Sequence, residues 1–493
     1  MPLELAPRAV VARRAGDAWY LASPQPLIES PDRLFDLVRR AAAGAPDRDF
    51  LVERRADGSL RRVTWAEALA FATGIAEWLI AAHPADARVM ALSGNSIDHA
   101  LLMLGCFAAG VPFVPVSPAY ALLSQDFAKL RVVVEKVAPA VVFVEAEAPY
   151  RRALDALALD AELVIGDALA ARVRTGDRLA AREAAVTVDH VAKILFTSGS
   201  TAFPKGVPNT HGMLCANQQM IAQCWPFLAA DEPPVLVDWL PWSHTFGGNH
   251  NFNLVLRHAG TLLIDEGRPT PVGIDATLRN LAALSPTLYF NVPAGYAALV
   301  PRLEADAALA RAFFARLRVM FYAAAALPPD LWQRLTALAR ASTDREVFMT
   351  TAWGSTETSP MATSTHFAVP AAGNIGLPAP GVTLKLVPSG AKLEVRVKGP
   401  SVMRGYLDEP ALTAAAFDDE GFYRIGDAVR FADPDRPEAG LCFDGRIAED
   451  FKLASGTWVS VTTIRTGVVA AAGGALADVV VCGHDRAQLA VLA

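Results

Sequence analysis

The stretch from Val191 to Asn209 limits what this chain can fold into more than any other. The apolar run Val191–Phe196 predicts a buried strand. A hydroxyl-rich turn, Thr197-Ser198-Gly199-Ser200-Thr201, follows it directly, and Lys205 comes shortly after. Backbone N–H groups and hydroxyls around a glycine can form a concave anion site, and a lysine supplies a mobile positive charge. The stretch therefore predicts a strand that ends in a polyphosphate-binding loop.

This loop differs from the Walker A pattern, in which a glycine directly precedes the lysine and Ser or Thr directly follows it. Here Lys205 lies between Pro204 and Gly206. An ordinary surface loop with one lysine is an equally good interpretation of the turn when it is taken alone. The segments farther along the chain decide between the two.

Composition excludes several classes of protein. Of the 493 residues, 53% are hydrophobic and 19% charged, which is enough apolar material for large cores and argues against disorder. The net charge of −6 and the lack of a compact Lys/Arg run argue against nucleic-acid binding. The longest apolar run, Ala100–Val116, is short and broken by Gly and Pro, so we expect a buried core segment and no membrane span.

The five cysteines are scattered along the chain and odd in number. This spacing suggests neither a zinc cluster nor a disulfide framework, and the N-terminus has no apolar leader region. Both observations predict a protein of the reducing cytoplasm. The sequence makes no prediction about the oligomeric state.

Apolar runs alternate with helical stretches through most of the chain. After an irregular lead-in over residues 1–30, runs at 88–92, 110–116 and 140–144 predict strands, and the pattern returns at 191–196, 235–240 and 287–292. Such alternation predicts an α/β fold of stacked, mostly parallel sheets flanked by helices. Thr64 and Glu67 form a capping-box signature for a helix that begins at Trp65.

The texture changes after residue 380. Lys392–Lys398 alternates strictly, which is typical of a half-buried strand, and glycines separate short runs around it. We therefore predict three units: a large α/β domain of two sheet subdomains over 1–379, a small β-barrel-like subdomain of the same domain over 380–446, and a C-terminal unit over 447–493.

A second polar segment is Trp353-Gly354-Ser355-Thr356-Glu357-Thr358. An indole can stack on a nucleotide base, which contributes about 1–3 kcal/mol in single-stranded complexes. Thr356 can bond a phosphate oxygen. Glu357 can hold Mg²⁺, which prefers one or two carboxylates together with phosphate oxygens. The alternative for this segment alone is a turn that leaves a strand.

Three further segments carry weaker signals. Asp427 follows a glycine at an expected strand end, where it can accept hydrogen bonds from both hydroxyls of a ribose. Arg446 and Lys452 lie beside an expected domain boundary, and His244 lies between aromatic residues and two glycines. Each could equally be an ordinary turn residue, part of a charged hinge or a core histidine. Plausible pocket residues are His244, Phe246, Tyr322 and Ala324.

In this order and spacing, the segments resemble the acyl-adenylate-forming (AMP-binding) superfamily, which includes acyl-CoA synthetases, adenylation domains of peptide synthetases and luciferases. Thr197 to Gly206 is similar to the family's phosphate loop, Thr-Ser-Gly-Ser-Thr-Gly-x-Pro-Lys-Gly, except at Ala202. The resemblance covers about residues 30–493. Lesser matches are Ala109–Val116, Ala324–Pro328 and Met403–Tyr406, and the segments most similar to feruloyl-CoA synthetases are Ser23–Leu27 and Asp444–Val459.

The resemblance implies two half-reactions. A carboxylate attacks the α-phosphate of Mg·ATP to give an acyl-AMP, and the thiol of coenzyme A then takes the acyl group, most plausibly that of ferulate or a related hydroxycinnamate. The implied catalytic residues are Lys205, His244, Thr356, Glu357 and Lys452, with Glu357 as the metal ligand. The implied nucleotide-binding residues are Thr197, Ser198, Gly199, Ser200, Thr201, Lys205, Ala324, Ala325, Trp353, Gly354, Ser355, Thr356, Asp427 and Arg446.

Two departures from the family pattern shape the expectations. Ala202 stands where the family has glycine. The family's C-terminal domain extends well beyond a hinge that aligns with Ala448 and includes a late lysine, whereas here the last lysine is Lys452. The resemblance therefore implies a truncated, partial α+β C-terminal domain over 447–493. We expect the chain to keep nucleotide and acid binding better than catalytic turnover. The alternatives are a catalytically impaired nucleotide- or acid-binding remnant and an adenylating enzyme that loads a carrier protein.

Overall fold

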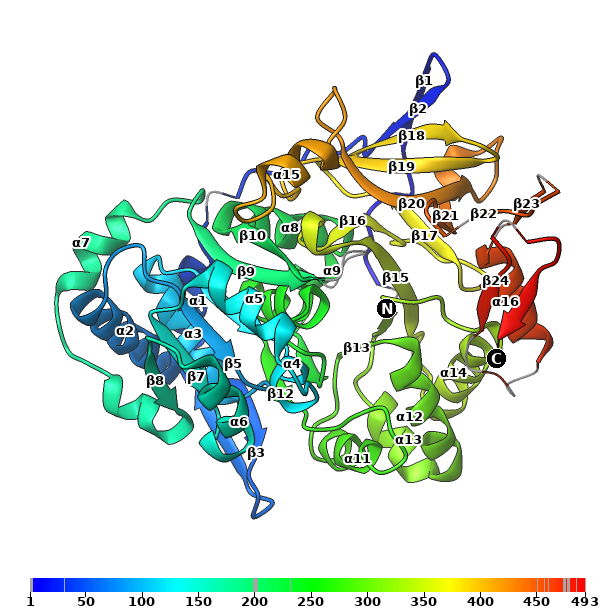
Figure 1. The fold of residues 1–493 in the computed structure, drawn as a ribbon. Coiled ribbons are helices and arrows are strands. Elements are labelled where there is room, and N and C mark those ends of the chain that lie inside the picture. Colours follow the sequence, from blue (N-terminus) through cyan, green and yellow to red (C-terminus); the bar gives the residue numbers. More distant parts are fainter. Residues whose placement is uncertain are drawn as a thin grey trace.

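A computed structural model describes residues 3–30, 32–197, 203–230, 232–449, 451–455, 457–459, 461–472, 476, 479–484 and 486–492. Within them, most strands belong to sheets of six, four and eleven strands, with helices packed on the sheet faces (Figure 1). Two further sheets of two strands each lie near the C-terminus. The α/β class predicted from the alternation of apolar runs is confirmed.

The six-stranded sheet contains the strand that leads into the predicted phosphate loop. Its order is β10-β9-β6-β5-β7-β8, and all neighbours run parallel except β10, which is antiparallel to β9. The strands are β5 (Val89–Leu92), β6 (Phe113–Val116), β7 (Val141–Val144), β8 (Glu162–Ile165), β9 (Val191–Thr197) and β10 (Lys205–Thr210). The strands predicted from apolar runs in this region are confirmed, because β5, β6 and β7 are buried along their whole length.

The first long helix of this region begins where the sequence predicts. α2 (Trp65–Ala82) is capped by Thr64, whose Oγ1 accepts from the Glu67 N–H at 3.3 Å while the Glu67 carboxylate accepts from the Thr64 N–H at 2.8 Å. In the described part of the chain, α2 is the one helix long and apolar enough to cross a membrane. Half of it is buried inside the protein, as in a core helix, so length and apolarity are weak evidence for a span.

The four-stranded sheet has the order β11-β12-β3-β4 and packs beside the first. Its strands are β3 (Asp49–Arg54), β4 (Leu60–Thr64), β11 (Val235–Asp238) and β12 (Thr261–Ile264).

The α-helices of the described residues besides α2 are α1 (Leu34–Gly44), α3 (Ile97–Ala109), α4 (Ala119–Leu122), α5 (Ala128–Val137), α6 (Glu147–Leu157), α7 (Arg178–Ala185), α8 (His211–Cys224), α9 (Phe227–Ala230), α10 (Phe252–Arg257), α11 (Ile274–Ala283), α12 (Pro293–Ala305), α13 (Ala307–Phe314), α14 (Pro329–Ser342), α15 (Pro410–Ala416) and α16 (Val461–Ala471).

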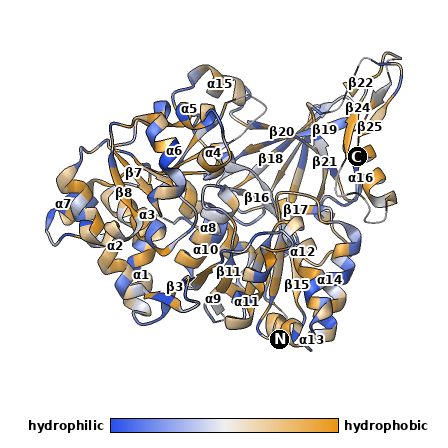
Figure 2. Ribbon diagram, turned by 60° about the horizontal axis from the view of Figure 1, so that its bottom comes forward, coloured by the Kyte–Doolittle hydropathy of each residue, from blue (hydrophilic) through white to orange (hydrophobic). Residues whose placement is uncertain are grey.

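The eleven-stranded sheet carries most of the predicted nucleotide-binding segments. Its order is β1-β2-β18-β19-β20-β21-β17-β16-β15-β14-β13. The strands are β1 (Val11–Ala15), β2 (Ala18–Ala22), β13 (Leu288–Asn291), β14 (Val319–Tyr322), β15 (Phe348–Gly354), β16 (Met361–Ser364), β17 (Asn374–Pro378), β18 (Thr383–Ser389), β19 (Lys392–Lys398), β20 (Tyr423–Phe431) and β21 (Leu441–Arg446). One apolar core joins this sheet to the other two, since it includes Phe113, Leu262 and Phe290, and apolar residues line the inner strands (Figure 2).

Two expectations about this sheet are wrong. The N-terminal lead-in is not irregular, because β1 and β2 form a hairpin whose second strand pairs with β18, with Leu21 opposite Leu384. The small subdomain after residue 380 is not a closed barrel, because β17 to β21 continue the same open sheet as β13 to β16. In both cases pairing across distant parts of the chain decides the structure, and a local pattern does not contain that information.

Two short strand pairs and one helix end the described chain. β22 (Phe451–Lys452) pairs with β23 (Trp458–Val459), α16 follows, and β24 (Val480–Cys482) pairs with β25 (Ala490–Leu492). Figure 1 places this red segment beside β21. The domain boundaries at 379 and 446 stay predictions.

Candidate active site

The two ends of the predicted phosphate loop face each other across β9 and β10. Thr197 ends β9 and is paired in register with Lys205, which begins β10. Both side chains are half-buried. The loop residues Ser198, Gly199, Ser200, Thr201 and Ala202 lie outside the described residues, so their phosphate-binding role stays a prediction. The observed pairing brings Lys205 to the mouth of this turn.

Glu357 and Lys205 meet at the side chain of Tyr406. Glu357 lies in the short 3₁₀ helix Thr356–Thr358 (η3), and its Oε1 accepts a hydrogen bond of 3.0 Å from the Tyr406 hydroxyl. The Lys205 ammonium lies 5.4 Å from the centroid of the Tyr406 ring, within the range of a cation–π contact. Two residues that the sequence places far apart are thus neighbours.

Trp353 and Asp427 form the adjoining part of the site. The Trp353 Nε1–H donates to Asp427 Oδ2 at 2.9 Å, and Arg446 Nε lies 3.3 Å from Oδ1 as an ion pair. Burial raises the pKa of Asp427, and the negative charge of Glu357 adds to the rise, while Trp353 and Arg446 oppose it. Trp353 lies near the end of β15, just before η3, so the bond from its indole brings Asp427 to the segment that carries Glu357.

The backbone around Trp353 and Glu357 is tightly packed. A Cβ on Gly354 would lie 1.8 Å from the carbonyl oxygen of Pro360, so this position admits only glycine. Thr358 Oγ1 accepts from the N–H of Ser355 at 2.8 Å, which closes the turn between β15 and η3. Thr356 is buried beside Glu357. The turn therefore fixes the position from which the Glu357 carboxylate projects.

The position of Asp427 corrects one expectation. Asp427 lies in the middle of β20 and not at a strand end. The register of β20 and β21 shifts between Asp427 and Val429, and Asp427 is paired with Arg446 there. A bulge of this kind re-aims a side chain within a sheet, which explains how a mid-strand carboxylate reaches the site.

His244 has the geometry of an uncharged hydrogen-bond donor. It precedes the π-helix Phe246–Asn251 (η2), its side chain is exposed, and its Nδ1 accepts from the Phe246 N–H at 3.3 Å. That bond assigns the ring proton to Nε2. Desolvation by the surrounding protein lowers the pKa of His244, so the ring is neutral near pH 7.

One predicted pocket residue points elsewhere. Phe246 packs on Phe321, with ring centroids 5.5 Å apart, whereas Tyr322 faces the opposite side of β14 and packs on Trp332, with centroids 6.2 Å apart. Successive side chains of a strand alternate, so Tyr322 does not share a pocket with Phe246. Ala324 lies in the exposed turn after β14 with φ of +73°, a conformation that costs an alanine about 1–2 kcal/mol and is found where the surroundings enforce it.

No contact with the site is described for two predicted residues, the nucleotide ligand Ala325 and the catalytic residue Lys452. Ala325 lies next to Ala324 in the exposed turn. Lys452 is in β22, paired with Trp458, and its side chain is outside the described part of the chain. The Ser355 backbone belongs to the site through the turn described above. Roles for Ala325 and Lys452 stay predictions.

The single carboxylate of Glu357 could hold Mg²⁺ only together with the phosphates of a nucleotide. Glu357 offers one carboxylate, and Mg²⁺ commonly takes one or two carboxylates and completes its shell with phosphate oxygens and water. In the described ranges, no group of three or more His, Cys, Asp or Glu side chains could hold a metal ion by itself. One carboxylate suits a Mg²⁺ ion that phosphate oxygens also hold, and magnesium binding by Glu357 stays a prediction.

The sequence did not predict a buried lysine in β9, the strand that leads into the predicted phosphate loop. Lys193 in β9 has no exposed surface, and its Nζ donates to the Gly248 carbonyl in η2 at 2.6 Å. Burial lowers the pKa of Lys193 to about 7. An apolar strand with one lysine gives no sign of which face the lysine occupies, because the hydropathy of Val191–Phe196 is dominated by its neighbours.

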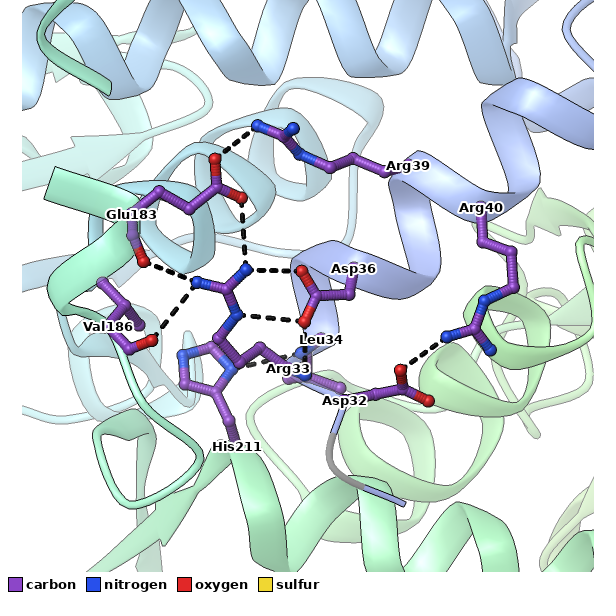
Figure 3. Close-up of polar contacts among 9 residues, drawn as sticks. All are labelled: Asp32, Arg33, Leu34, Asp36, Arg39, Arg40, Glu183, Val186 and His211. Carbon is purple, nitrogen blue, oxygen red and sulfur yellow. Dashed lines mark hydrogen bonds and ion pairs between the residues drawn. The ribbon is translucent and has the colours of Figure 1, made fainter. Parts of the chain in front are cut away.

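A separate charged cluster lies away from these residues. Arg33 at the start of α1 bonds Asp36, Glu183 and the carbonyls of Glu183 and Val186, and Arg39 pairs with Glu183 at 2.5 Å (Figure 3). The cluster lines an open surface depression of about 520 Å³. The charges are already paired across α1 and α7, so this cluster ties two helices together and offers no unsatisfied group to a ligand.

The comparison with known proteins assigns the family. The family model of the AMP-binding enzymes matches residues 38–407. This chain belongs to the AMP-binding enzyme family. The resemblance inferred from the phosphate loop, the Trp353 segment and Asp427 is confirmed at that level.

The relatives of this chain are named for several different activities. It is 30% identical to a probable nonribosomal peptide synthetase, CymA, of Salinispora arenicola, over 79% of this chain and 5% of that protein. It is 27% identical to the benzoate–CoA ligase of Thauera aromatica, over 78% of this chain and 70% of the ligase. A malonyl-CoA ligase with methylmalonyl-CoA and AMP bound superposes with a TM-score of 0.67 at 28% identity, over 93% of this chain and 91% of that one. The chain spans less than half the length of the first curated relatives it matches.

Proposed function

We propose that this family member is an ATP-dependent ligase that joins a carboxylic acid to coenzyme A, with ferulate or a related hydroxycinnamate as the acid. The observation that carries the proposal is the convergence of Lys205, Glu357 and Asp427 through Tyr406 and Trp353. A cation for phosphates, a carboxylate for Mg²⁺ and a buried acceptor for ribose hydroxyls are the groups that one Mg·ATP requires.

The reaction balances as two displacements. A carboxylate oxygen of the acid attacks the α-phosphorus of ATP, the bond to the bridging oxygen breaks, and pyrophosphate leaves. The sulfur of coenzyme A then attacks the acyl carbon, AMP leaves, and the thiol proton passes to solvent. No covalent bond to the protein is needed, so the chain acts by positioning and charge.

The described residues divide these tasks among them. Lys205 offsets the negative charge of the phosphates. Glu357 would hold Mg²⁺, which supplies further charge neutralisation when bound. Trp353 flanks the base and holds Asp427 for the ribose hydroxyls. His244 is proposed to position the substrate carboxylate through its Nε2–H, and Lys452 is proposed to act in thioester formation.

An aromatic acid is supported by the sequence resemblance to feruloyl-CoA synthetases and by a benzoate–CoA ligase among the relatives. Relatives named for malonate and for a medium-chain fatty acid define the competing substrates. ATP–pyrophosphate exchange on the 493-residue chain with ferulate, benzoate, malonate and octanoate tests the proposal. Exchange with ferulate and CoA-dependent thioester formation are expected. Absence of exchange with every acid would contradict it, and ATP binding without exchange would favour the impaired binding protein.

A second candidate is an adenylating enzyme that loads a carrier protein. It is favoured by the match to a peptide synthetase over 79% of this chain. The same assay separates the two, because a carrier-loading enzyme releases pyrophosphate and acylates a phosphopantetheinyl carrier protein but not free coenzyme A.

A cytoplasmic location is part of the proposal. All five cysteines are free, three of them buried, which suits a reducing compartment. Fractionation of the native host with an antibody against the chain tests the location.

Asp427→Asn should weaken ATP binding by about 10-fold, because a hydrogen bond to a charged group contributes about 1.5–3 kcal/mol. The raised pKa of Asp427 adds a pH dependence: wild-type binding is present above that pKa and is lost as the solution is acidified through it. The Asn variant loses this dependence. Calorimetric titration at neutral and mildly acidic pH measures both effects, with the exposed Asp57→Asn as control; equal affinities for wild type and Asp427→Asn would exclude a ribose-binding role.

A further inference from the structure

One short segment, Met403–Leu407, is bonded to both halves of the proposed phosphate site. The Met403 N–H donates to the carbonyl of Glu357 at 2.7 Å. The Leu407 N–H donates to the carbonyl of Gly206, directly after Lys205, at 2.9 Å. The segment therefore joins β10, a strand of the six-stranded sheet, to η3, which follows β15 of the eleven-stranded sheet.

The approach between this segment and β10 is close. A Cβ on Gly206 would lie 3.0 Å from the Leu407 Cβ, so the two backbones are in near contact. At its other end the segment is anchored by the buried side chain of Met403, and the Tyr406 N–H donates to Thr413 Oγ1 of α15 at 2.9 Å. These contacts hold the backbone of the segment without help from the Tyr406 hydroxyl.

The side chain of Tyr406 makes two contacts that backbone packing does not need. Its hydroxyl donates to Glu357 Oε1 at 3.0 Å, and its ring lies 5.4 Å from the Lys205 ammonium. A phenol is protonated near pH 7, so the Tyr406 hydroxyl is a donor to this carboxylate. The second hydroxyl nearby, that of Tyr423, lies 3.4 Å from it.

We propose that Tyr406 is a positioning residue that orients the Glu357 carboxylate for Mg²⁺ while its ring holds the Lys205 ammonium beside the same phosphates. The proposal rests on the proposed function, because both partners act only on a bound Mg·nucleotide. Removing one hydrogen bond to a metal-ligating carboxylate commonly lowers metal affinity or activity by 10–100-fold. A purely structural role would change stability and leave the metal dependence as it is.

Tyr406→Phe tests this directly, because it removes one oxygen and keeps the ring. Mn²⁺ binding in the presence of a non-hydrolysable ATP analogue, followed by electron paramagnetic resonance, is expected to weaken by about 10-fold. The Mg²⁺ concentration needed for half-maximal pyrophosphate exchange should rise by a similar factor. Binding of the analogue without metal should stay the same, since Trp353 and Asp427 are unchanged.

Tyr20→Phe is the matched control. Its hydroxyl also bonds a glutamate, Glu420 at 3.0 Å, in an exposed contact between β2 and the turn that precedes β20. Tyr406→Leu is the second variant: it also removes the ring under Lys205 and should weaken pyrophosphate affinity beyond the Phe variant.

The outcomes separate this inference from the function it rests on. If wild type exchanges pyrophosphate and Tyr406→Phe binds Mn²⁺ as wild type does, the positioning role is wrong and the ligase proposal stands. If wild type binds no Mg·nucleotide, the ligase proposal itself fails. A metal defect equal in Tyr406→Phe and Tyr20→Phe would point to general destabilisation and would also overturn the positioning role.

Discussion

Lys193→Met should remove most of the increase in stability that the wild-type protein shows between pH 7 and pH 10. Burial lowers the pKa of Lys193 from 10.5 to about 7, so the folded state binds this proton more weakly than the unfolded state does. The stability present above about pH 10.5 is therefore lost as the pH falls towards 7. This lowering of the pKa of Lys193 can change the free energy of unfolding by at most about 5 kcal/mol, since each pKa unit is about 1.4 kcal/mol.

The surroundings of Lys193 explain why this proton is held weakly. Its ammonium lies 5.6 Å from the centroid of the Phe107 ring and 5.7 Å from that of Phe252, and one carbonyl, that of Gly248, accepts from it. No carboxylate in the described part of the chain pairs with it. His99 nearby has a pKa lowered to about 4 by burial and is therefore neutral across the window. The charged form of Lys193 is left with little compensation for its lost hydration.

Urea unfolding of wild type and Lys193→Met at several pH values measures the difference. Near pH 7 the free energies of unfolding of wild type and Lys193→Met should become equal, or the variant should become the more stable. Methionine avoids the cost of a buried charge there, even though the Gly248 carbonyl loses its partner. Lys129→Met, at an exposed position, is the control and should give a profile parallel to wild type. A parallel profile for Lys193→Met would show that Lys193 is not buried as described.

The second large effect is expected for Glu357→Gln. Glutamine keeps the size of the side chain and an oxygen that can accept from the Tyr406 hydroxyl, so the local packing should survive. The negative charge is lost, and removal of one preorganised group that stabilises the transition state commonly costs about 10²–10³ in rate. The initial rate of pyrophosphate exchange at saturating ATP measures this loss.

A second glutamate variant and the melting temperature are the controls for Glu357→Gln. Glu420→Gln changes an exposed carboxylate that bonds Tyr20 and should exchange at the wild-type rate. The melting temperature of Glu357→Gln should stay near that of wild type, because its backbone bond to Met403 is unaffected. An exchange rate equal to wild type would remove Glu357 from the active site.

Much of the fold follows from local sequence patterns. Buried parallel strands are continuous apolar runs, and β5, β6, β7 and β9 lie where such runs predict them. The helix cap at Thr64 is equally local. The hairpin of β1 and β2 was not predicted, because Val11–Ala15 is mostly exposed and becomes a strand through pairing at the edge of a distant sheet.

In the candidate site, too, local motifs could be predicted and contacts across the fold could not. The motif residues Lys205, Trp353, Glu357 and Asp427 could be named from the sequence, since their types and order carry the chemistry. The role of Tyr406 depends on one hydrogen bond across the fold. Tyr322 was expected to line the pocket, but its side chain lies on the face of β14 that α14 covers. Neither is a property of neighbouring residues. The bulge that re-aims Asp427 likewise needs the pairing of β20 with β21.

The central claim is that Lys205, Glu357 and Asp427 serve one molecule of Mg·ATP. A crystal structure of this chain grown with Mg²⁺ and a non-hydrolysable ATP analogue tests it most directly. The account predicts phosphate oxygens beside Lys205, a magnesium ion bound by Glu357 and the same phosphates, and ribose hydroxyls on Asp427. A nucleotide bound elsewhere, or one that contacts Lys205 with Glu357 and Asp427 turned to other surfaces, would contradict it.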